Sequence, residues 1–195
     1  MRVVDTDKIE RVKLETKKLI VEKGYHGASI SEIAKRAKVS DGYLYRHFKS
    51  KVELVTHIFK SQLKEFHDFV FELLEIKTNA RDLTHEVIKF LFKLHEGNPI
   101  AIKFTDALIH DFEFEYPESR AKAIDEIMSR VLMLGKSTGE FSSKIREIDV
   151  STTIFTIPVK YIDYQNKGYY QQNNNHLSKE EEIKLLLNIC MNALK

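Results

Sequence analysis

The residues that interrupt helices are scarce in this sequence, which has three Pro and seven Gly among 195 residues. Together with abundant Leu, Ile, Lys and Glu, this scarcity predicts a mostly helical protein. The single cysteine, Cys190, excludes a scaffold held by internal disulfides. No apolar run reaches the roughly 18 residues of a membrane-spanning helix, and the first residues lack the apolar stretch of a signal peptide. We therefore expect a cytoplasmic protein with no membrane partner.

Charge is distributed unevenly along the chain, although the net charge is only +2. Residues 1–60 contain fourteen Lys and Arg against eight Asp and Glu, a net charge of +6. Residues 61–195 contain seventeen Lys and Arg against twenty-one Asp and Glu, a net charge of −4. A basic module joined to a mildly acidic body is typical of a polyanion-binding domain attached to a separate core.

Helix starts are marked by capping boxes, in which Ser or Asp precedes a Glu by three residues. Between these starts, apolar residues recur at helical spacing and no strand pattern is convincing. Pro158 should kink the eighth helix near Ile154, because proline cannot donate the helical hydrogen bond. The predicted fold is all-α with about nine helices, at residues 7–23, 29–37, 41–48, 50–76, 79–95, 99–112, 117–134, 149–168 and 178–194.

The second and third predicted helices are short and are separated by the tight turn Lys38-Val39-Ser40. Such a pair forms a helix-turn-helix unit, whose second helix enters the major groove of DNA. The unit needs small residues where its helices cross, and Ala34 and Ala37 meet that need. It also needs an apolar residue in the turn, which Val39 supplies.

The run Val39-Ser40-Asp41-Gly42-Tyr43-Leu44-Tyr45-Arg46-His47-Phe48-Lys49-Ser50-Lys51, preceded by Gly24-Tyr25 and Ser29-Ile30-Ser31-Glu32-Ile33-Ala34, resembles the signature of the TetR (tetracycline repressor) family. The resemblance covers about residues 8–58. It implies a helix-turn-helix DNA-binding domain over residues 1–58. It also implies a helical domain for effector binding and dimerisation over residues 59–195.

The resemblance also implies roles for individual residues. Ser40 and Lys51, at helix N-termini, should meet phosphates, while Tyr45 and His47 should clamp phosphates. Gly42 should allow close approach of the backbone, and Tyr43 and Arg46 should reach bases, since Arg suits guanine. Phe48 is assigned to the core. The predicted DNA-binding set is Ser29, Ser40, Asp41, Gly42, Tyr43, Tyr45, Arg46, His47 and Lys51.

Two of these residues depart from the usual family pattern, and their roles stay open at this point. Asp41 either accepts a hydrogen bond from cytosine or, the favoured alternative, stabilises the dipole of its helix. Tyr43 stands where a small hydroxyl residue is common, so its ring could touch a thymine methyl group or a phosphate. Tyr45 could also be a packing residue. A basic rim of Lys35, Arg36, Lys38 and Lys49 should strengthen binding without sequence preference.

The last two predicted helices carry apolar residues at alternating spacings of three and four, as a seam between helices requires. Each helix also has a second apolar face, so one face could pack on the core while the other packs across a dimer interface. Burial within a monomer is the alternative. The predicted homodimer interface comprises Ile154, Ile157, Tyr161, Tyr164, Ile183, Leu187, Cys190 and Leu194.

An effector pocket is suggested by aromatic and apolar residues of the C-terminal domain, although such residues are more often core. The candidates are Phe104, Leu108, Phe112, Phe155 and Tyr161. The pairs Asp82/His85 and Asp106/His110 have metal-compatible spacing, but surface ion pairs or capping are favoured, and no metal or cofactor is expected. No catalytic set is present, so we expect no enzyme activity.

The resulting hypothesis is a ligand-responsive repressor. It would bind a palindromic, double-stranded operator as a homodimer and be released by a small apolar or aromatic effector. The alternative is a helix-turn-helix architectural or protein-interaction module that needs no effector. A helical metalloenzyme that uses the Asp/His pairs is a third and weaker hypothesis.

Overall fold

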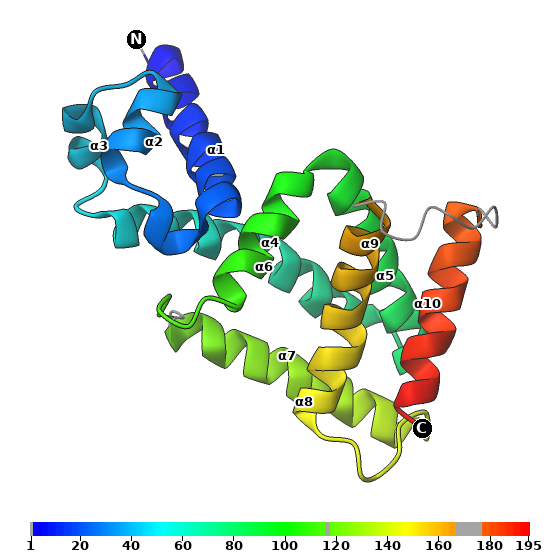
Figure 1. Ribbon diagram of the computed structural model, residues 1–195. Coiled ribbons are helices and arrows are strands. Elements are labelled where there is room, and N and C mark those ends of the chain that lie inside the picture. Colours follow the sequence, from blue (N-terminus) through cyan, green and yellow to red (C-terminus); the bar gives the residue numbers. More distant parts are fainter. Residues whose placement is uncertain (1, 116–117, 167–176) are drawn as a thin grey trace. The chain divides into compact units, whose positions relative to one another are not determined.

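The computed structural model of the 195-residue chain describes residues 2–115, 118–166 and 177–195. These residues form helices and no strand (Figure 1). Nine helices are present in the described ranges when α8, η1 and α9 are counted as one continuous helix. The predicted all-α fold is therefore confirmed. The polar loop predicted around residues 171–175 lies outside the described residues.

The chain divides into two compact units that do not follow a single boundary. Unit 1 comprises residues 1–65 and 98–120, and unit 2 comprises residues 66–97 and 121–195. The predicted division at residues 58 and 59 follows the end of the helix-turn-helix pattern. The compact unit that contains the helix-turn-helix extends to residue 65 and includes a segment from the middle of the chain, because α6 packs on α1.

Unit 1 is built around the helix-turn-helix. Its elements are α1 (Arg2–Gly27), α2 (Ile30–Ala37), α3 (Asp41–His47), the first part of α4 (Lys51–Ile76) and α6 (Pro99–Ile109). The helix α1 begins at Arg2, five residues before the predicted start, and Gly24 has the predicted positive φ of 75°. A further helical turn follows Gly24 and carries α1 to Gly27.

The predicted serine caps are present at α2 and α3. The Ser29 Oγ accepts from the Glu32 N–H at 3.2 Å, and the Ser40 Oγ accepts from the Tyr43 N–H at 3.1 Å. Each cap satisfies a backbone donor that the first helical turn leaves without a partner. These local contacts explain why α2 and α3 begin where the sequence predicted.

The core of unit 1 joins the helix-turn-helix to α6 and to the segment after it. Phe104 and Leu108 of α6 are fully buried in this core, and the Phe114 ring packs edge-on against Tyr25 and Phe59 with centroids 5.4 and 5.2 Å apart. Other buried members are Val12, Leu19, Ile20, Ile33, Leu44, Val55 and Ile58.

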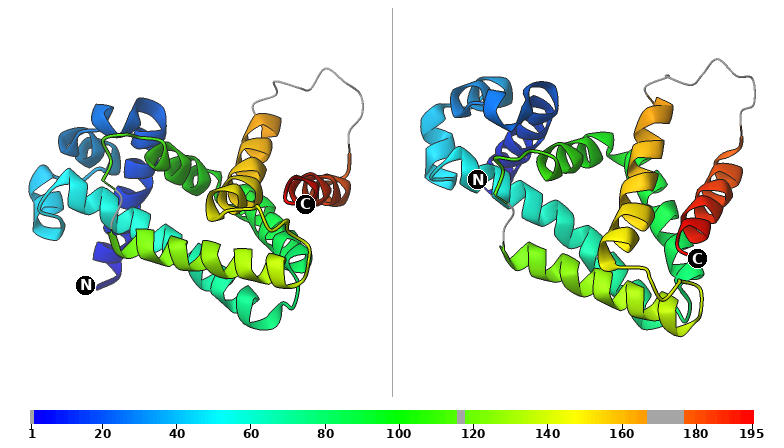
Figure 2. Two further views of the ribbon diagram at one scale, coloured as in Figure 1. Left: turned by 90° about the horizontal axis from the view of Figure 1, so that it is seen from below. Right: turned by 60° about the horizontal axis from the view of Figure 1, so that its bottom comes forward.

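Unit 2 contains the second part of α4 and the remaining helices. These are α5 (Ala80–Gly97), α7 (Glu118–Ser137), α8 (Glu147–Val150), η1 (Ser151–Thr156), α9 (Ile157–Asn166) and α10 (Lys179–Ala193). The last helix packs against α5 and η1, as the two views of Figure 2 show. Its predicted capping box is confirmed, with the Ser178 and Glu181 side chains each bonded to the other's backbone N–H.

Pro158 has a different effect from the simple kink that was predicted. The helix widens into a π-helical turn over Ser151–Thr156, and the Ile157 N–H donates to the Thr152 carbonyl, five residues earlier. Proline at position 158 cannot donate to the Ile154 carbonyl, so regular α-helical bonding cannot continue through this point. The π turn accommodates the missing donor without ending the helix.

Candidate nucleic-acid interface

The turn between α2 and α3 fixes the helix-turn-helix. Lys38 is left-handed, with φ 56°, and the Val39 N–H donates to the Ala34 carbonyl at 3.0 Å. Ala34 and Ala37 are buried at the crossing, as their small size predicted. Leu44 of α3 is buried as well, so the opposite side of α3 faces outward.

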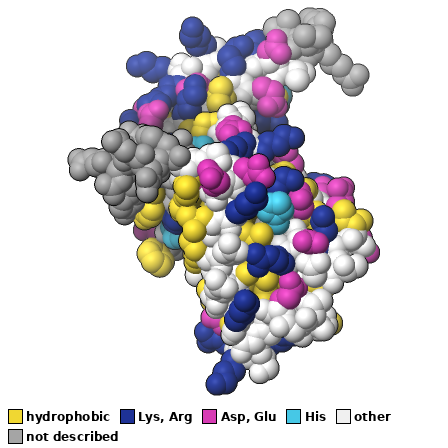
Figure 3. Space-filling view, turned by 90° about the vertical axis from the view of Figure 1, so that its right-hand side faces the viewer, with side chains coloured by type: hydrophobic (Ala, Val, Ile, Leu, Met, Phe, Trp, Pro, Cys, Tyr) yellow, Lys and Arg dark blue, Asp and Glu magenta, His cyan; other side chains and the backbone are white. Residues whose placement is uncertain are grey.

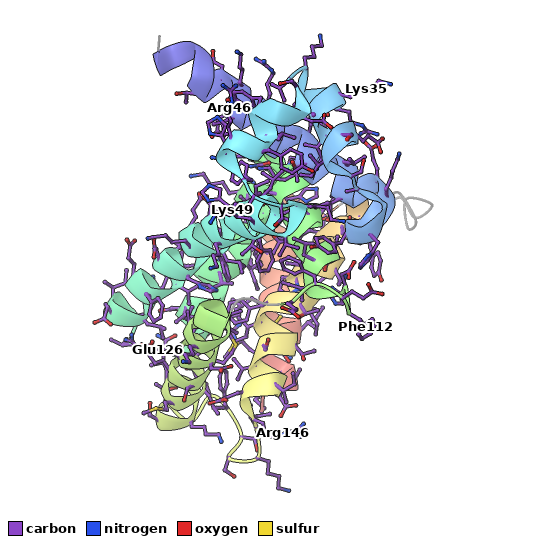
Figure 4. All side chains as sticks on the ribbon, turned by 90° about the vertical axis from the view of Figure 1, so that its left-hand side faces the viewer. Lys35, Arg46, Lys49, Phe112, Glu126 and Arg146 are labelled. Carbon is purple, nitrogen blue, oxygen red and sulfur yellow. The ribbon has the colours of Figure 1, made fainter. Side chains whose placement is uncertain are left out.

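The outward face of α3 carries much of the predicted DNA-binding set. Arg46 and His47 are exposed, and 57% of Tyr45 is accessible. Figure 4 shows Arg46 on the outer side of this helix. Asp41 and Gly42 are exposed at its N-terminus, where free N–H groups and the helix dipole favour a phosphate. This arrangement can present cations and hydrogen-bond donors to a DNA groove.

Tyr43 does not belong to this exposed set. Only 6% of the residue is accessible, and its ring centroid lies 4.7 Å from that of His47. Two cations lie over the ring, with the Arg46 Cζ at 5.6 Å and the Lys8 Nζ at 5.7 Å from its centroid. A ring buried in this way is a poor candidate for the predicted base or phosphate contact, and in the free chain it contacts neighbouring side chains.

Asp41 has a partner that neither sequence interpretation included. Its Oδ2 accepts a hydrogen bond from the Ser31 Oγ at 2.6 Å, which joins the first turn of α3 to α2. The position in the first turn also agrees with the favoured dipole interpretation. A carboxylate that is engaged by Ser31 is a poor candidate for a cytosine contact.

Lys51 is directed toward α1. Its Nζ donates to the Tyr25 and Ala28 carbonyls at 2.9 and 3.1 Å, and it lies 4.4 Å from the centroid of the Tyr25 ring. These contacts satisfy carbonyls at the C-terminal end of α1, where helical partners run out. In the free chain Lys51 therefore has a structural role, and its predicted phosphate contact stays a prediction.

The predicted basic rim is present in part. Lys35, Lys38 and Lys49 are exposed, and Figure 4 shows Lys35 directed outward from α2. Arg36, in contrast, is paired with Glu22 at 2.7 Å, and this hydrogen bond raises the pKa of its guanidinium. Figure 3 shows Lys and Arg side chains on the surface of unit 1.

Comparisons with known proteins agree with this geometry. Residues 15–58 match the family described as bacterial regulatory proteins, tetR family. This match identifies residues 15–58 as a TetR-type helix-turn-helix segment.

The chain matches the first curated relatives over only part of their length. The Bacillus subtilis (strain 168) "Fatty acid metabolism regulator protein" is 35% identical over 80 residues, which is 41% of this chain and 41% of that relative. The chain thus matches about two fifths of that relative's length.

Two solved structures of transcription regulators have the same fold over nearly the whole chain. A TetR family transcription regulator from Marinobacter aquaeolei VT8 has a TM-score of 0.75 and 19% identity, covering 100% of this chain and 98% of that one. FadR from Bacillus subtilis in complex with stearoyl-CoA has a TM-score of 0.65 and 21% identity, covering 95% of this chain and 99% of the FadR chain.

The predicted effector-pocket residues are divided between the two units. Phe104 and Leu108 are buried in the core of unit 1, while Phe112 is fully exposed and points away from the chain (Figure 4). Phe155 and Tyr161 pack half-buried in unit 2. Periodicity marks an apolar helix face but does not show which neighbours that face meets.

A cluster of half-buried rings in unit 2 was missed as a pocket candidate. The Phe66 ring lies 5.6 Å from Phe155 and 5.8 Å from Phe90, and Phe69 stacks on Phe90 at 4.3 Å. Phe66 and Phe69 are three residues apart on α4, a spacing that places them on one face. That aromatic pair was the signal available in the sequence. We call Phe66, Phe69, Phe90 and Phe155 the aromatic cluster.

Most residues of the predicted dimer seam are buried within the chain itself. Five of its eight residues are buried in the core of unit 2, namely Ile154, Ile183, Leu187, Cys190 and Leu194. Ile157 and Tyr161 are half-buried, and only Tyr164 is exposed. The exposed apolar residues of α10 are instead Leu185 and Ile189, which form its other face. In the single chain, the predicted interface residues of α10 therefore face the core, and its second apolar face is exposed.

The Asp/His pairs have local partners. The His110 Nδ1 lies 2.9 Å from the Asp106 carbonyl oxygen, and Asp82 exchanges hydrogen bonds with Asn79 at the start of α5. Among the described residues, no three His, Cys, Asp or Glu are grouped to hold a metal ion. In the same part of the chain, no helix has the length and apolar character needed to span a bilayer.

Proposed function

We propose that this chain is a TetR-family transcriptional regulator that binds a palindromic operator as a homodimer and is released by an apolar small molecule. The observation that carries the proposal is the capped helix-turn-helix with Tyr45, Arg46 and His47 exposed on the outer face of α3. Arg46 is the candidate for reading guanine, and Ser40, Tyr45 and His47 are candidates for phosphate contacts.

DNA binding is tested by selecting duplexes from a random library with the full-length chain and measuring their affinity by fluorescence anisotropy. We expect the selected duplexes to share a palindrome, with affinity falling steeply as salt rises, because phosphate contacts release counterions. Arg46→Ala should weaken binding and relax preference at one position of each half-site. Equal affinity for selected and random duplexes would contradict sequence-specific regulation.

Dimerisation is supported by the apolar residues that unit 2 leaves exposed. Leu185 and Ile189 lie one turn apart on α10 with 42% and 43% accessible, and Tyr164 of α9 is 46% accessible. The Gln165 Nε2 donates to the Glu182 Oε1 at 2.5 Å, which joins α9 to α10. Figure 3 views unit 2 from the side on which α10 lies, and it shows hydrophobic side chains among the charged ones there. A two-fold pair of chains would present two recognition helices to one palindrome.

The dimer is tested by light scattering on Leu185→Glu and Ile189→Glu. Either charge should convert a dimer to monomers, because it would be buried without a partner at the interface. Met133→Glu is the matched control, since Met133 is an exposed apolar residue on α7, outside the proposed face. A dimer that survives both substitutions on α10 would exclude this face.

The aromatic cluster is the proposed effector site. Its rings are half-buried and apolar, and such surroundings suit a long hydrocarbon chain. The names of two relatives, a fatty acid metabolism regulator and FadR in complex with stearoyl-CoA, make a long-chain acyl-CoA the first candidate. The helix α4 carries Phe66 and Phe69 and also begins beside the helix-turn-helix, so it supplies a continuous backbone link between the two functions.

Titration of the DNA complex with stearoyl-CoA tests this assignment, with free coenzyme A and stearate as the controls. We expect stearoyl-CoA to release the duplex and Phe69→Leu to weaken that release while leaving DNA affinity intact. Release by none of the three compounds would exclude an acyl-CoA effector. Stable DNA binding that no small apolar molecule changes would favour the architectural alternative.

A further inference from the structure

Tyr43 occupies an unusual position in the helix-turn-helix, because it lies on the recognition helix and yet is buried. It is the third residue of α3, and its backbone N–H is held by the Ser40 cap. Within four residues of it on the same helix are Arg46 and His47, both exposed. The buried ring therefore lies beside two exposed side chains of the proposed DNA-binding set.

Two cations from different helices lie over this ring. The Arg46 Cζ is 5.6 Å and the Lys8 Nζ is 5.7 Å from the ring centroid, and Lys8 belongs to α1. Both distances are within the range in which an aromatic quadrupole attracts a cation. The ring of His47, centred 4.7 Å away, adds a third contact from α3.

We propose that Tyr43 is a positioning residue for DNA recognition, and that its ring holds Arg46 and Lys8 in place before DNA arrives. This inference rests on the proposed DNA binding. Free Lys and Arg side chains lose much rotamer freedom when they are fixed on a ligand. A ring that restricts them in the free protein reduces that loss, and it keeps the guanidinium in the orientation that a bidentate guanine contact needs.

The substitutions Tyr43→Phe and Tyr43→Leu separate this role from simple packing. Phenylalanine keeps both the apolar volume and the aromatic face. Leucine keeps an apolar side chain in the core but has no face to attract a cation. If the ring positions the cations, only leucine should weaken DNA recognition.

The geometry is tested first in the free protein by NMR. The side-chain protons of Arg46 and Lys8 should show upfield ring-current shifts in the wild type and in Tyr43→Phe, and should lose them in Tyr43→Leu. Absence of such shifts in the wild type would overturn the inference without reference to DNA.

The consequence is then measured on a duplex selected from a random library with the wild-type chain. We expect Tyr43→Phe to bind within about twofold of wild type, and Tyr43→Leu to lose about two- to fivefold for each cation released. In an Arg46→Ala, Lys8→Ala background, the difference between Phe and Leu should disappear. A core residue would instead give the same difference in both backgrounds, because its effect does not depend on the cations.

The outcomes distinguish this inference from the proposed function. If the wild-type chain selects no duplex, the proposed function fails and the DNA role of Tyr43 fails with it. If a duplex is selected and the Phe and Leu variants bind it equally, only the role of Tyr43 is overturned. Equal losses for Phe and Leu would assign the effect to the hydroxyl group and would also overturn it.

Discussion

The Ser31 hydroxyl donates a 2.6 Å hydrogen bond to the Asp41 Oδ2, and this contact joins α2 to the first turn of the recognition helix. Both residues are exposed, so the bond lies at the surface that is proposed to meet DNA. It fixes α3 against α2 close to the point where a phosphate would approach the α3 N-terminus. Asp41 therefore contributes to the geometry of the site while adding a negative charge to it.

Substitutions at this pair should separate its geometric effect from its electrostatic effect. Ser31→Ala should lower the free energy of unfolding by about 0.5–1 kcal/mol and weaken DNA binding, because α3 loses a brace. Asp41→Asn keeps an acceptor for Ser31 and removes the charge, so it should leave stability nearly unchanged and raise DNA affinity at low salt. Urea unfolding and fluorescence anisotropy measure the two effects. Weaker DNA binding by Asp41→Asn would instead implicate the charge in recognition.

Lys51 gives a second prediction, which concerns stability. Lys51→Met should lower the free energy of unfolding by about 1.5–3 kcal/mol, because the Tyr25 and Ala28 carbonyls lose a charged donor. Lys49→Met is the matched control, since Lys49 is exposed two residues earlier and should change stability by less than about 0.5 kcal/mol. Urea unfolding of both variants makes the comparison. Equal stability of the two would return Lys51 to the phosphate role that the sequence predicted.

The serine caps at Ser29, Ser40 and Ser178 could be predicted from the sequence, whereas the contacts between distant segments could not. Ser29, Ser40 and Ser178 each accept a hydrogen bond from the backbone N–H three positions later. Each cap can therefore be recognised from a short stretch of sequence. Glu140 also caps a helix, but its carboxylate accepts from the Ala80 and Arg81 N–H groups, about sixty residues earlier in the chain. No local pattern indicates such a partner.

The orientation of α10 and the burial of Tyr43 could not be predicted, for a related reason. The helix α10 is apolar on two faces, and periodicity alone cannot show whether Ile183 and Leu187 or Leu185 and Ile189 face the core. The burial of Tyr43 likewise depends on tertiary packing, including Lys8 of α1, 35 positions away. The sequence therefore predicts which residues lie near the site, and the tertiary contacts decide what each one does.

Cys190 gives a prediction about alkaline pH. Burial raises the pKa of its thiol from 9.0 to about 11, and its Sγ donates to the Thr153 carbonyl at 3.1 Å. The folded chain holds this proton more tightly than the unfolded chain does, so the stabilisation is complete below pH 9.0 and is lost as pH rises toward about 11. Urea unfolding across that interval should show a smaller loss of stability in Cys190→Ala than in the wild type.

The pKa values of Tyr25 and Tyr161 are also raised, first by burial, so the wild-type curve alone does not isolate the thiol. The difference in stability loss between wild type and Cys190→Ala isolates the contribution of the thiol, because both tyrosines are present in each protein. Alkylation gives an independent check, since a buried protonated thiol should react with iodoacetamide only after unfolding. Identical alkaline losses in the two proteins would show that the thiol does not contribute.

Gly135 gives the last prediction, in the C-terminal part of α7. A Cβ at this position would lie 2.1 Å from the Cδ2 of Phe141, a buried side chain in the core of unit 2. In an ordinary helix interior, replacing Gly by Ala stabilises by up to about 1 kcal/mol. Here we expect Gly135→Ala to lower the free energy of unfolding by about 1–3 kcal/mol, because the Phe141 ring must move. Adding Phe141→Leu should recover part of this loss in urea unfolding, whereas a stabilising effect of Gly135→Ala alone would mean that the ring has room to shift.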